Sequence, residues 1–149
     1  MKTILVIILL NVIVVPGIQA QEASSKHEQE IYTLIDYYSM AREKRDTSLL
    51  KSILMPDIDQ LVSSGEWRMG IQAALHGMLQ SSAGNPGTRR LTIEYLRFLN
   101  SYCAIADARY DIQNTDSTER KMWSSFIVVY DKNSWKISAI RNMLPAPSR

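Results

Sequence analysis

The stretch that decides the fold is residues 121–145, which read KMWSSFIVVYDKNSWKISAIRNMLP. Apolar residues dominate or alternate with polar ones on both sides of the turn-forming triplet at 131–133. This pattern predicts two β-strands, residues 122–130 and 134–143, joined by a tight turn. Each strand carries a tryptophan, and the second ends at Arg141 and Asn142.

Three segments upstream have apolar residues at helical spacing. The first helix is predicted over residues 28–45, and its stripe consists of Ile31, Leu34, Ile35, Tyr38 and Ala41. A second, shorter helix is predicted to start at a cap provided by Asp46 or Thr47 and to stop at Pro56. A third begins near Gly70.

The remaining segments have the two-residue period of strands. A short strand pair is predicted within residues 57–68, a longer strand from Arg89 onward, and another over 102–112, with a polar loop at 113–121. Helices that precede a run of strands indicate the α+β class, and strands joined by short loops are expected to pair antiparallel. The helical stripes then pack on one face of the sheet.

The first 20 residues predict a secretory signal peptide. Lys2 is their only charge, residues 4–15 are almost entirely apolar, and Ala20 is a small residue at the cut. The proline and glycine at 16–17 are expected to break a helix there. The run is too short for a spanning helix, so we expect no membrane anchor after cleavage and a secreted or periplasmic protein. Residues 21–27 are predicted to be a flexible leader, and residues 146–149 a tail.

The composition argues against several classes of function. A formal charge of +2 over 149 residues gives no general attraction to nucleic acid. The basic groups at 42–45 and 89–90 are interpreted as solvated faces. Cys103 is the only cysteine, which excludes an intramolecular disulfide and predicts a small apolar filler. We find no metal-ligand spacing, no phosphate-binding loop and no cofactor motif, so no metal and no cofactor are expected.

Three segments in this order resemble the nuclear transport factor 2-like superfamily, in its SnoaL-like branch: PDIDQLV at 56–62, GEWRMGI at 65–71 and WKISAIRN at 135–142. The resemblance covers residues 28–145, predicted as one domain. It implies a cone in which a curved antiparallel sheet wraps around about three helices, and an open end leads to a pocket. Members include isomerases, epoxide hydrolases, polyketide cyclases, dehydratases and binding domains, so the fold alone does not select a function.

The resemblance places the mouth of the pocket at the end of the last strand. Arg141 and Asn142 point to opposite faces there, because side chains alternate along a strand. Arg141 shares its parity with Trp135 and Ile137, so it is predicted to face the cavity and to bind a carboxylate in a bidentate manner. The alternative is an internal ion pair with an acid such as Asp57.

Five other side chains complete the candidate site. Trp67 and Trp123 are possible pocket walls and Tyr38 a rim hydroxyl, alongside Arg141 and Asn142 as ligand-binding residues. Asp57 and Asp107 are the candidate catalytic acids. Each has a structural alternative: the tryptophans fill the core, Asp57 caps a turn, and Asp107 pairs with a neighbouring arginine.

The leading hypothesis is a pocket domain that binds a small, partly apolar molecule. Whether the protein is an enzyme stays open; the alternatives are a cofactor-free isomerase, hydratase or cyclase, and a structural dimerisation or partner-binding module. Because helices inside the cone cannot cover the outer sheet face, residues such as Phe98 and Ile105 are expected to leave an apolar patch there and to form a homodimer.

Overall fold

The computed structural model of the chain describes residues 16–146. The apolar segment of the predicted signal peptide, residues 4–15, and the end of the predicted tail lie outside these residues. The described chain forms three helices and six strands. The helices are α1 (Pro16–Lys44), α2 (Thr47–Ile53) and α3 (Gly70–Gly84). The strands are β1 (Leu54–Leu61), β2 (Trp67–Met69), β3 (Gly87–Asn100), β4 (Cys103–Asn114), β5 (Glu119–Asp131) and β6 (Ser134–Met143).

The helices follow the predicted order but differ at their ends. Asp46 caps α2, since its side chain accepts a hydrogen bond from the backbone N–H of Leu49 at 2.9 Å. The start of α1 at Pro16 corrects two predictions, the helix break at 16–17 and the flexible leader at 21–27. Proline suits the first turn of a helix because no partner is needed there for its missing N–H, and the following Gln, Glu and Ala residues favour helix.

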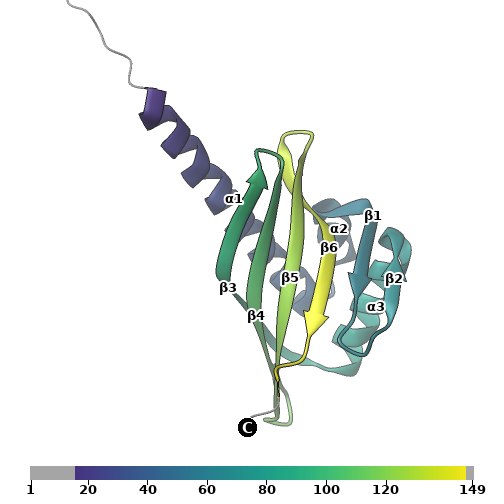
Figure 1. The fold of residues 1–149 in the computed structure, drawn as a ribbon. Helices are drawn as coiled ribbons and strands as arrows, with labels where there is room; N and C mark the ends of the chain where they lie inside the picture. The colour runs from purple at the N-terminus through teal and green to yellow at the C-terminus, as the bar shows by residue number, and fades with distance from the viewer. Residues whose placement is uncertain (1–15, 147–149) are drawn as a thin grey trace, which may run out of the picture.

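The sheet has the strand order β2-β1-β6-β5-β4-β3, and it curves around the helical layer without closing (Figure 1). All neighbouring strands are antiparallel except β1 and β6, which are parallel. The fold class is α+β, as predicted, but the sheet is mixed rather than wholly antiparallel. The reason is that β1 and β6 are not consecutive, so no short turn forces them to run in opposite directions.

The hairpin between β4 and β5 is longer than predicted. Residues 113–121 were expected to form a loop, yet β4 continues to Asn114 and β5 begins at Glu119. The connecting turn is closed by a backbone hydrogen bond from Asn114 to Thr118 of 2.9 Å, and Ser117 has a φ of 68°. The exposed ends of these two strands have no apolar alternation, so the sequence pattern does not predict them. They pair through the hydrogen bonds of the ladder alone.

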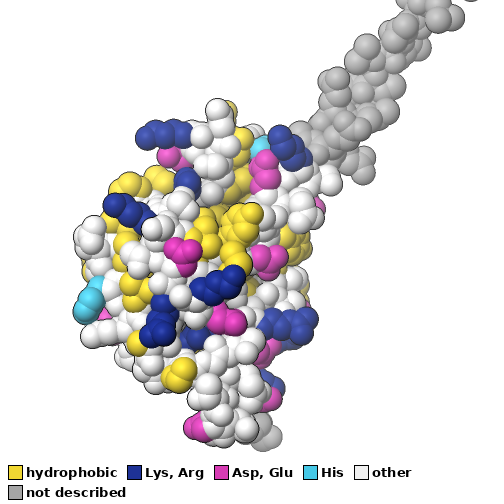
Figure 2. All heavy atoms as spheres, turned by 180° about the vertical axis from the view of Figure 1, so that it is seen from behind, with side chains coloured by type: hydrophobic (Ala, Val, Ile, Leu, Met, Phe, Trp, Pro, Cys, Tyr) yellow, Lys and Arg dark blue, Asp and Glu magenta, His cyan; other side chains and the backbone are white. Residues whose placement is uncertain are grey.

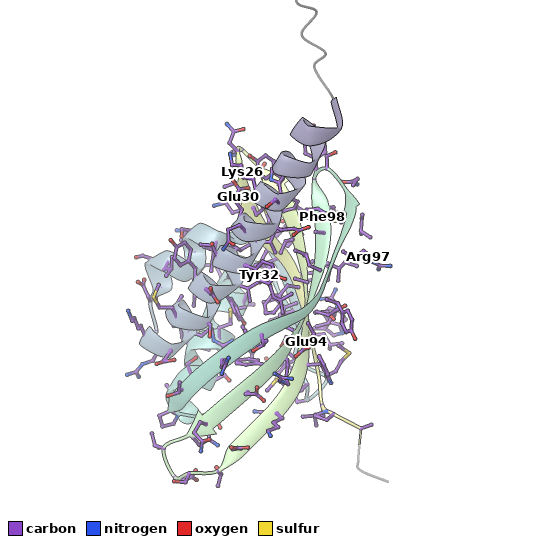
Figure 3. All side chains as sticks on the ribbon, turned by 90° about the vertical axis from the view of Figure 1, so that its left-hand side faces the viewer. Lys26, Glu30, Tyr32, Glu94, Arg97 and Phe98 are labelled. Carbon is purple, nitrogen blue, oxygen red and sulfur yellow. The ribbon has the colours of Figure 1, made fainter. Side chains whose placement is uncertain are left out.

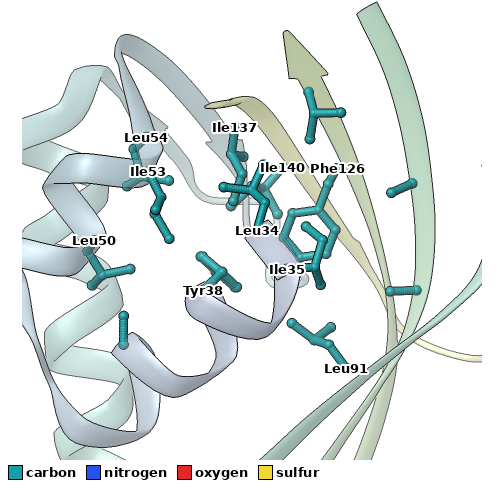
Figure 4. Close-up of a cluster of buried hydrophobic side chains, with 14 of the residues drawn as sticks. Leu34, Ile35, Tyr38, Leu50, Ile53, Leu54, Leu91, Phe126, Ile137 and Ile140 are labelled. Carbon is teal, nitrogen blue, oxygen red and sulfur yellow. The ribbon is translucent and has the colours of Figure 1, made fainter. Parts of the chain in front are cut away.

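The core lies between the helices and the inner face of the sheet (Figure 4). The predicted stripe of α1 is buried, including the fully buried Ile31 and Ile35. Tyr38 packs edge-on against Phe126 of β5, with their ring centroids 5.3 Å apart. The three alanines of β4, at 104, 106 and 108, are fully buried on the same face and leave room for these larger rings.

A bulge in the β5–β6 ladder changes which side chains face the core. Phe126 lies opposite Ile140, whereas Val128 lies opposite Ile137, so β6 has one more residue than β5 between these pairs. Ile137 and Ile140 are therefore both fully buried although they are three residues apart. An extra residue moves every later side chain to the other face. Beyond the bulge, Asn142 lies on the inner face and Arg141 on the outer one.

Candidate functional site

A groove of about 1130 Å³ lies between α1, α2 and the start of β6. Its lining includes the buried side chains of Leu34, Ile53 and Trp135, together with Leu49 and the half-exposed ring of Tyr37. Figure 2 views the helical side and shows hydrophobic atoms gathered near its middle, with basic and acidic side chains around them. Such a groove, apolar inside and polar at its rim, has the character of a small-molecule site.

The rim of this groove carries charges of both signs. Lys26 and Glu30 project from the same side of α1, one helical turn apart, with 3.8 Å between the ammonium nitrogen and a carboxylate oxygen (Figure 3). Across the groove, the ammonium of Lys136 donates to the backbone carbonyl of Ser52 at the end of α2. Lys136 forms no ion pair with any acid of the described residues, so the rim has one cation available to a ligand.

His27 connects the rim to the wall of the groove. Its Nδ1 accepts a hydrogen bond from Trp135 Nε1–H at 3.1 Å and lies 3.0 Å from a carboxylate oxygen of Glu30. Its ring also packs edge-on against Tyr130, at 5.1 Å between centroids. Because an indole N–H can only donate and a carboxylate can only accept, Nδ1 bonds to Trp135 when it is unprotonated and to Glu30 when it is protonated, so the two contacts compete for it. The contact with Trp135 joins residues 108 positions apart, so no local sequence pattern indicates it.

A second cluster is polar and lies inside the cone, further along α1. Arg42 is only 5% exposed; its Nε donates to Ser82 Oγ of α3 at 3.1 Å and its Nη1 donates to the hydroxyl of Tyr38 at 2.8 Å. Tyr110 of β4 is also buried, and burial raises the pKa of its hydroxyl. Tyr38 is thus an interior residue and not the rim hydroxyl that was predicted.

The buried arginines correct a prediction. Arg42 and Arg89 were assigned to solvated faces, yet each is only 5% exposed. The sequence did contain a signal: Arg42 extends the helical stripe beyond Tyr38 by four residues, and Arg89 shares the strand parity of Leu91. The charge of an arginine usually keeps it at the surface, but at these two positions the apolar pattern of the element is the better guide to burial.

Arg141 lies on the outer face of the sheet, where it was not expected. It forms an ion pair with Asp59 of β1, and its guanidinium lies 4.8 Å from the centre of the Trp67 ring. The predicted cavity position of Arg141 is therefore wrong, because the bulge reverses its parity. The ion-pair alternative is correct in kind, although the partner is Asp59 and not Asp57.

The predicted site residues do not form one cluster. Trp67 and Trp123 lie on the outer face and are 53% and 38% exposed. Asp107, on the same face of β4, accepts a hydrogen bond from Ser125 Oγ, and Asp57 is exposed on β1. Only Asn142 and Tyr38 lie on the inner side; Asn142 Oδ1 accepts from Ser124 Oγ at 2.8 Å. The predicted set is thus split between opposite faces of the sheet.

Three further features of residues 16–146 bear on the site. None of the helices there combines the length and the apolar character needed to cross a membrane. Within the same residues, His, Cys, Asp and Glu side chains form no group of three that could hold a metal ion. Cys103 is half-buried on the outer face of β4, rather than a core filler as predicted.

The architecture places the described residues in the nuclear transport factor 2-like fold, a cone of curved sheet over helices. A protein of this class with a cystatin-like fold from Novosphingobium aromaticivorans is similar to 93% of the chain, over 94% of its own length, with a TM-score of 0.78 and 14% identity. A domain of unknown function from Nostoc punctiforme gives a TM-score of 0.72 at 16% identity, covering 80% of this chain and 78% of that one.

A third structure is a nuclear transport factor 2-like protein of unknown function from Shewanella oneidensis, with a TM-score of 0.68 and 17% identity over 78% of this chain and 98% of that one. No protein-family model and no curated protein matches the chain. At these sequence identities the similarity establishes the fold only. The function therefore has to be argued from the residues of the site.

Proposed function

We propose that this protein is a small-molecule-binding domain whose ligand occupies the groove between α1, α2 and the start of β6. The observation that carries the proposal is the groove itself, with about 1130 Å³ of space, an apolar lining and a charged rim. Sites for small molecules are commonly clefts of roughly 300–1,000 Å³ lined by apolar side chains with a few polar groups. Lys136, the rim cation without an acidic partner among the described residues, suits a ligand that carries a polar or anionic group at one end.

The experiment begins with native mass spectrometry of the purified protein, which is expected to show a co-purified molecule. Tyr37→Ala then removes a ring that lines the groove, and Tyr32→Ala is the matched control, because Tyr32 lies on the same helix, is similarly exposed and does not line this groove. The anionic fluorescent probe anilinonaphthalene sulfonate, which favours apolar grooves, reports binding.

Tyr37→Ala is expected to weaken probe binding about tenfold, as losing roughly 1–2 kcal/mol of apolar contact implies, while Tyr32→Ala leaves binding unchanged. Equal affinity of the two variants, or no binding by the wild-type protein, contradicts the proposal. The enzymatic alternative has no comparable support, because neither Asp57 nor Asp107 faces Tyr38 or the groove.

A homodimer that packs through the outer sheet face is the second part of the proposal. Trp123 and Met143 are direct cross-strand partners on that face and are 38% and 46% exposed. Trp67 continues the surface on the far side of Arg141. Adjacent exposed aromatic and methionine side chains are typical of protein interfaces. Of the two residues first expected in this patch, Ile105 lies on the outer face, but Phe98 packs against Trp135 on the inner side.

The proposed setting of this function is outside the cytoplasm. The apolar segment at 4–15 and the small residue at 20 support removal of a signal peptide. N-terminal sequencing of the exported protein is expected to begin near Gln21. A mature chain that begins at Met1 contradicts both the cleavage and the proposed location.

A further inference from the structure

The polar cluster inside the cone has two arginines, and neither is paired with an acid. Arg42 uses Nε and Nη1 to bond the oxygens of Ser82 and Tyr38. Arg89 of β3 donates from Nη1 to the carbonyl of Gly87 at 3.2 Å and from Nη2 to that of Asn85 at 2.6 Å. Among the described residues, no carboxylate lies within 4.0 Å of either guanidinium.

Tyr110 lies beside both arginines. Its hydroxyl and the Nε of Arg89 are both buried and make no well-formed hydrogen bond within the part of the chain that the structure describes, although the Arg89 side chain lies close enough to the hydroxyl to lower its pKa as a hydrogen-bond donor. Burial raises the pKa of the Tyr110 hydroxyl more than the nearby charges of Arg42 and Arg89 lower it. Tyr110 therefore stays protonated at neutral pH and offers its O–H as a donor.

The cluster has an excess of hydrogen-bond donors over acceptors. A guanidinium has five N–H donors and no acceptor, so the two arginines bring about ten, and the hydroxyls of Tyr38 and Ser82 already accept from Arg42. Buried charge without a partner of opposite sign is strongly unfavourable. The chemical group that satisfies such a cluster accepts hydrogen bonds only and carries negative charge.

We propose that Arg42, Arg89 and Tyr110 form a binding site for a small oxyanion, namely a carboxylate, phosphate or sulfate group. Arg42 and Arg89 supply the charge from α1 and β3, which are far apart in sequence. Tyr110 supplies a neutral donor from the neighbouring strand. Charge-assisted bonds from guanidinium to oxyanion are among the stronger hydrogen bonds in proteins, which suits a site this deeply buried.

Of the three site residues, Arg89 lines a groove at the surface. A groove of about 520 Å³ lies between α1 and β3, and Arg89, Ser39 and Glu43 line it. Ser39 Oγ donates to the carbonyl of Arg89, and a Glu43 carboxylate oxygen accepts from the Arg89 backbone N–H at 3.3 Å, so these contacts hold the strand and leave the guanidinium to the interior. The site shares no lining residue with the larger groove. The two proposals can therefore fail separately.

The experiment measures the melting temperature of the full-length protein in sodium phosphate, sulfate or acetate, each against chloride at equal ionic strength. A ligand that binds only the folded state raises the melting temperature with concentration. Above the Kd, each tenfold increase of the effective anion is expected to raise it by roughly 4 °C or more. The anion with the steepest rise identifies the preferred oxyanion class.

Arg42→Met is the test variant, and Arg97→Met is its matched control. Arg97 is an exposed arginine on β3 that projects away from α1 (Figure 3). The control is expected to keep the anion-dependent rise, and Arg42→Met to lose it, apart from the general salt effect that both variants share. Where Arg42→Met does not fold, Tyr110→Phe keeps the ring and removes the donor; it is expected to weaken anion binding about tenfold.

Two results overturn the proposal. One is a wild-type melting temperature that rises no more in phosphate, sulfate or acetate than in matched chloride. The other is an anion-dependent rise that persists undiminished in Arg42→Met, or in Tyr110→Phe where that variant is used, since the stabilising anion then binds elsewhere.

Discussion

The two faces of the sheet differ in what their aromatic residues do. On the inner face, Phe126 is fully buried and meets Tyr38 of α1. On the outer face of the same strand, Trp123 is 38% exposed and touches no helix layer. They are three positions apart in the strand, an odd number, so their side chains lie on opposite faces of the sheet. The difference shows that a large aromatic side chain does not by itself indicate a pocket. The face of the sheet on which it lies decides whether it is buried.

The largest expected effect contrasts these two positions of β5. Phe126→Ala empties a fully packed site and is expected to lower the free energy of unfolding by about 3–5 kcal/mol. Trp123→Ala, measured with both variants at a protein concentration low enough to keep them monomeric, is expected to cost less than half as much because its ring is partly exposed in the single chain. Urea denaturation measures both. Similar losses would show that the outer face is as tightly packed as the inner one.

A second contrast compares a buried leucine of α3 with an exposed leucine of β3. Leu75 is 6% exposed in the core, and Leu99 at the end of β3 is 53% exposed. Leu75→Ala, like Leu34→Ala on α1, is expected to cost about 2–5 kcal/mol, whereas Leu99→Ala stays within about 0.5 kcal/mol. A change below 0.5 kcal/mol for Leu75→Ala contradicts the assigned core face of the helix.

The outer face can be tested as an interface. Light scattering at micromolar concentration is expected to give a dimer mass for the wild-type protein. Trp123→Lys places a charge next to Met143 and is expected to weaken dimerisation by about 2–4 kcal/mol, as for a central interface aromatic. Lys132→Glu, in the turn between β5 and β6, is the control. A monomer mass for the wild-type protein contradicts the proposed homodimer.

The smallest effect concerns Arg141 and its partner Asp59. Both side chains are about 30% exposed, so solvent screens their ion pair. Arg141→Ala is expected to lower the free energy of unfolding by no more than about 1 kcal/mol and to leave ligand binding in the α1–α2–β6 groove unchanged. Calorimetry and probe titration of one preparation measure both quantities. Loss of probe affinity in a folded variant would show that Arg141 takes part in ligand binding.

Local patterns were enough to predict the class of fold. The stripe from Ile31 to Ala41, the Asp46 cap of α2 and the alternation in the last two strands each rest on contacts within a few residues. Periodicity and capping report such contacts directly. The order of helices and strands then limits the architecture to an α+β layer. The SnoaL-like branch and the ligand stay predictions.

The candidate site depended on features that sequence periodicity does not contain. A single bulge between β5 and β6 exchanges the faces of Arg141 and Asn142, and its one local mark is the break in alternation at the adjacent apolar pair Ala139 and Ile140, which does not by itself show which residue is the extra one. The parallel pairing of β1 with β6 brings Asp59 to Arg141 from 82 residues away. These arrangements depend on the register between strands that are distant in sequence. The packing of the whole core determines that register.

The chain by itself therefore determined which segments become helix or strand and which stripes are apolar, because those properties depend on neighbours along the backbone. Only the tertiary structure decided that Arg42 and Arg89 are interior and that Trp67 and Trp123 are exterior. It also decided that α1, α2 and β6 enclose a groove. The physical reason is that burial depends on which elements pack together, and elements far apart in sequence contribute to every one of these sites.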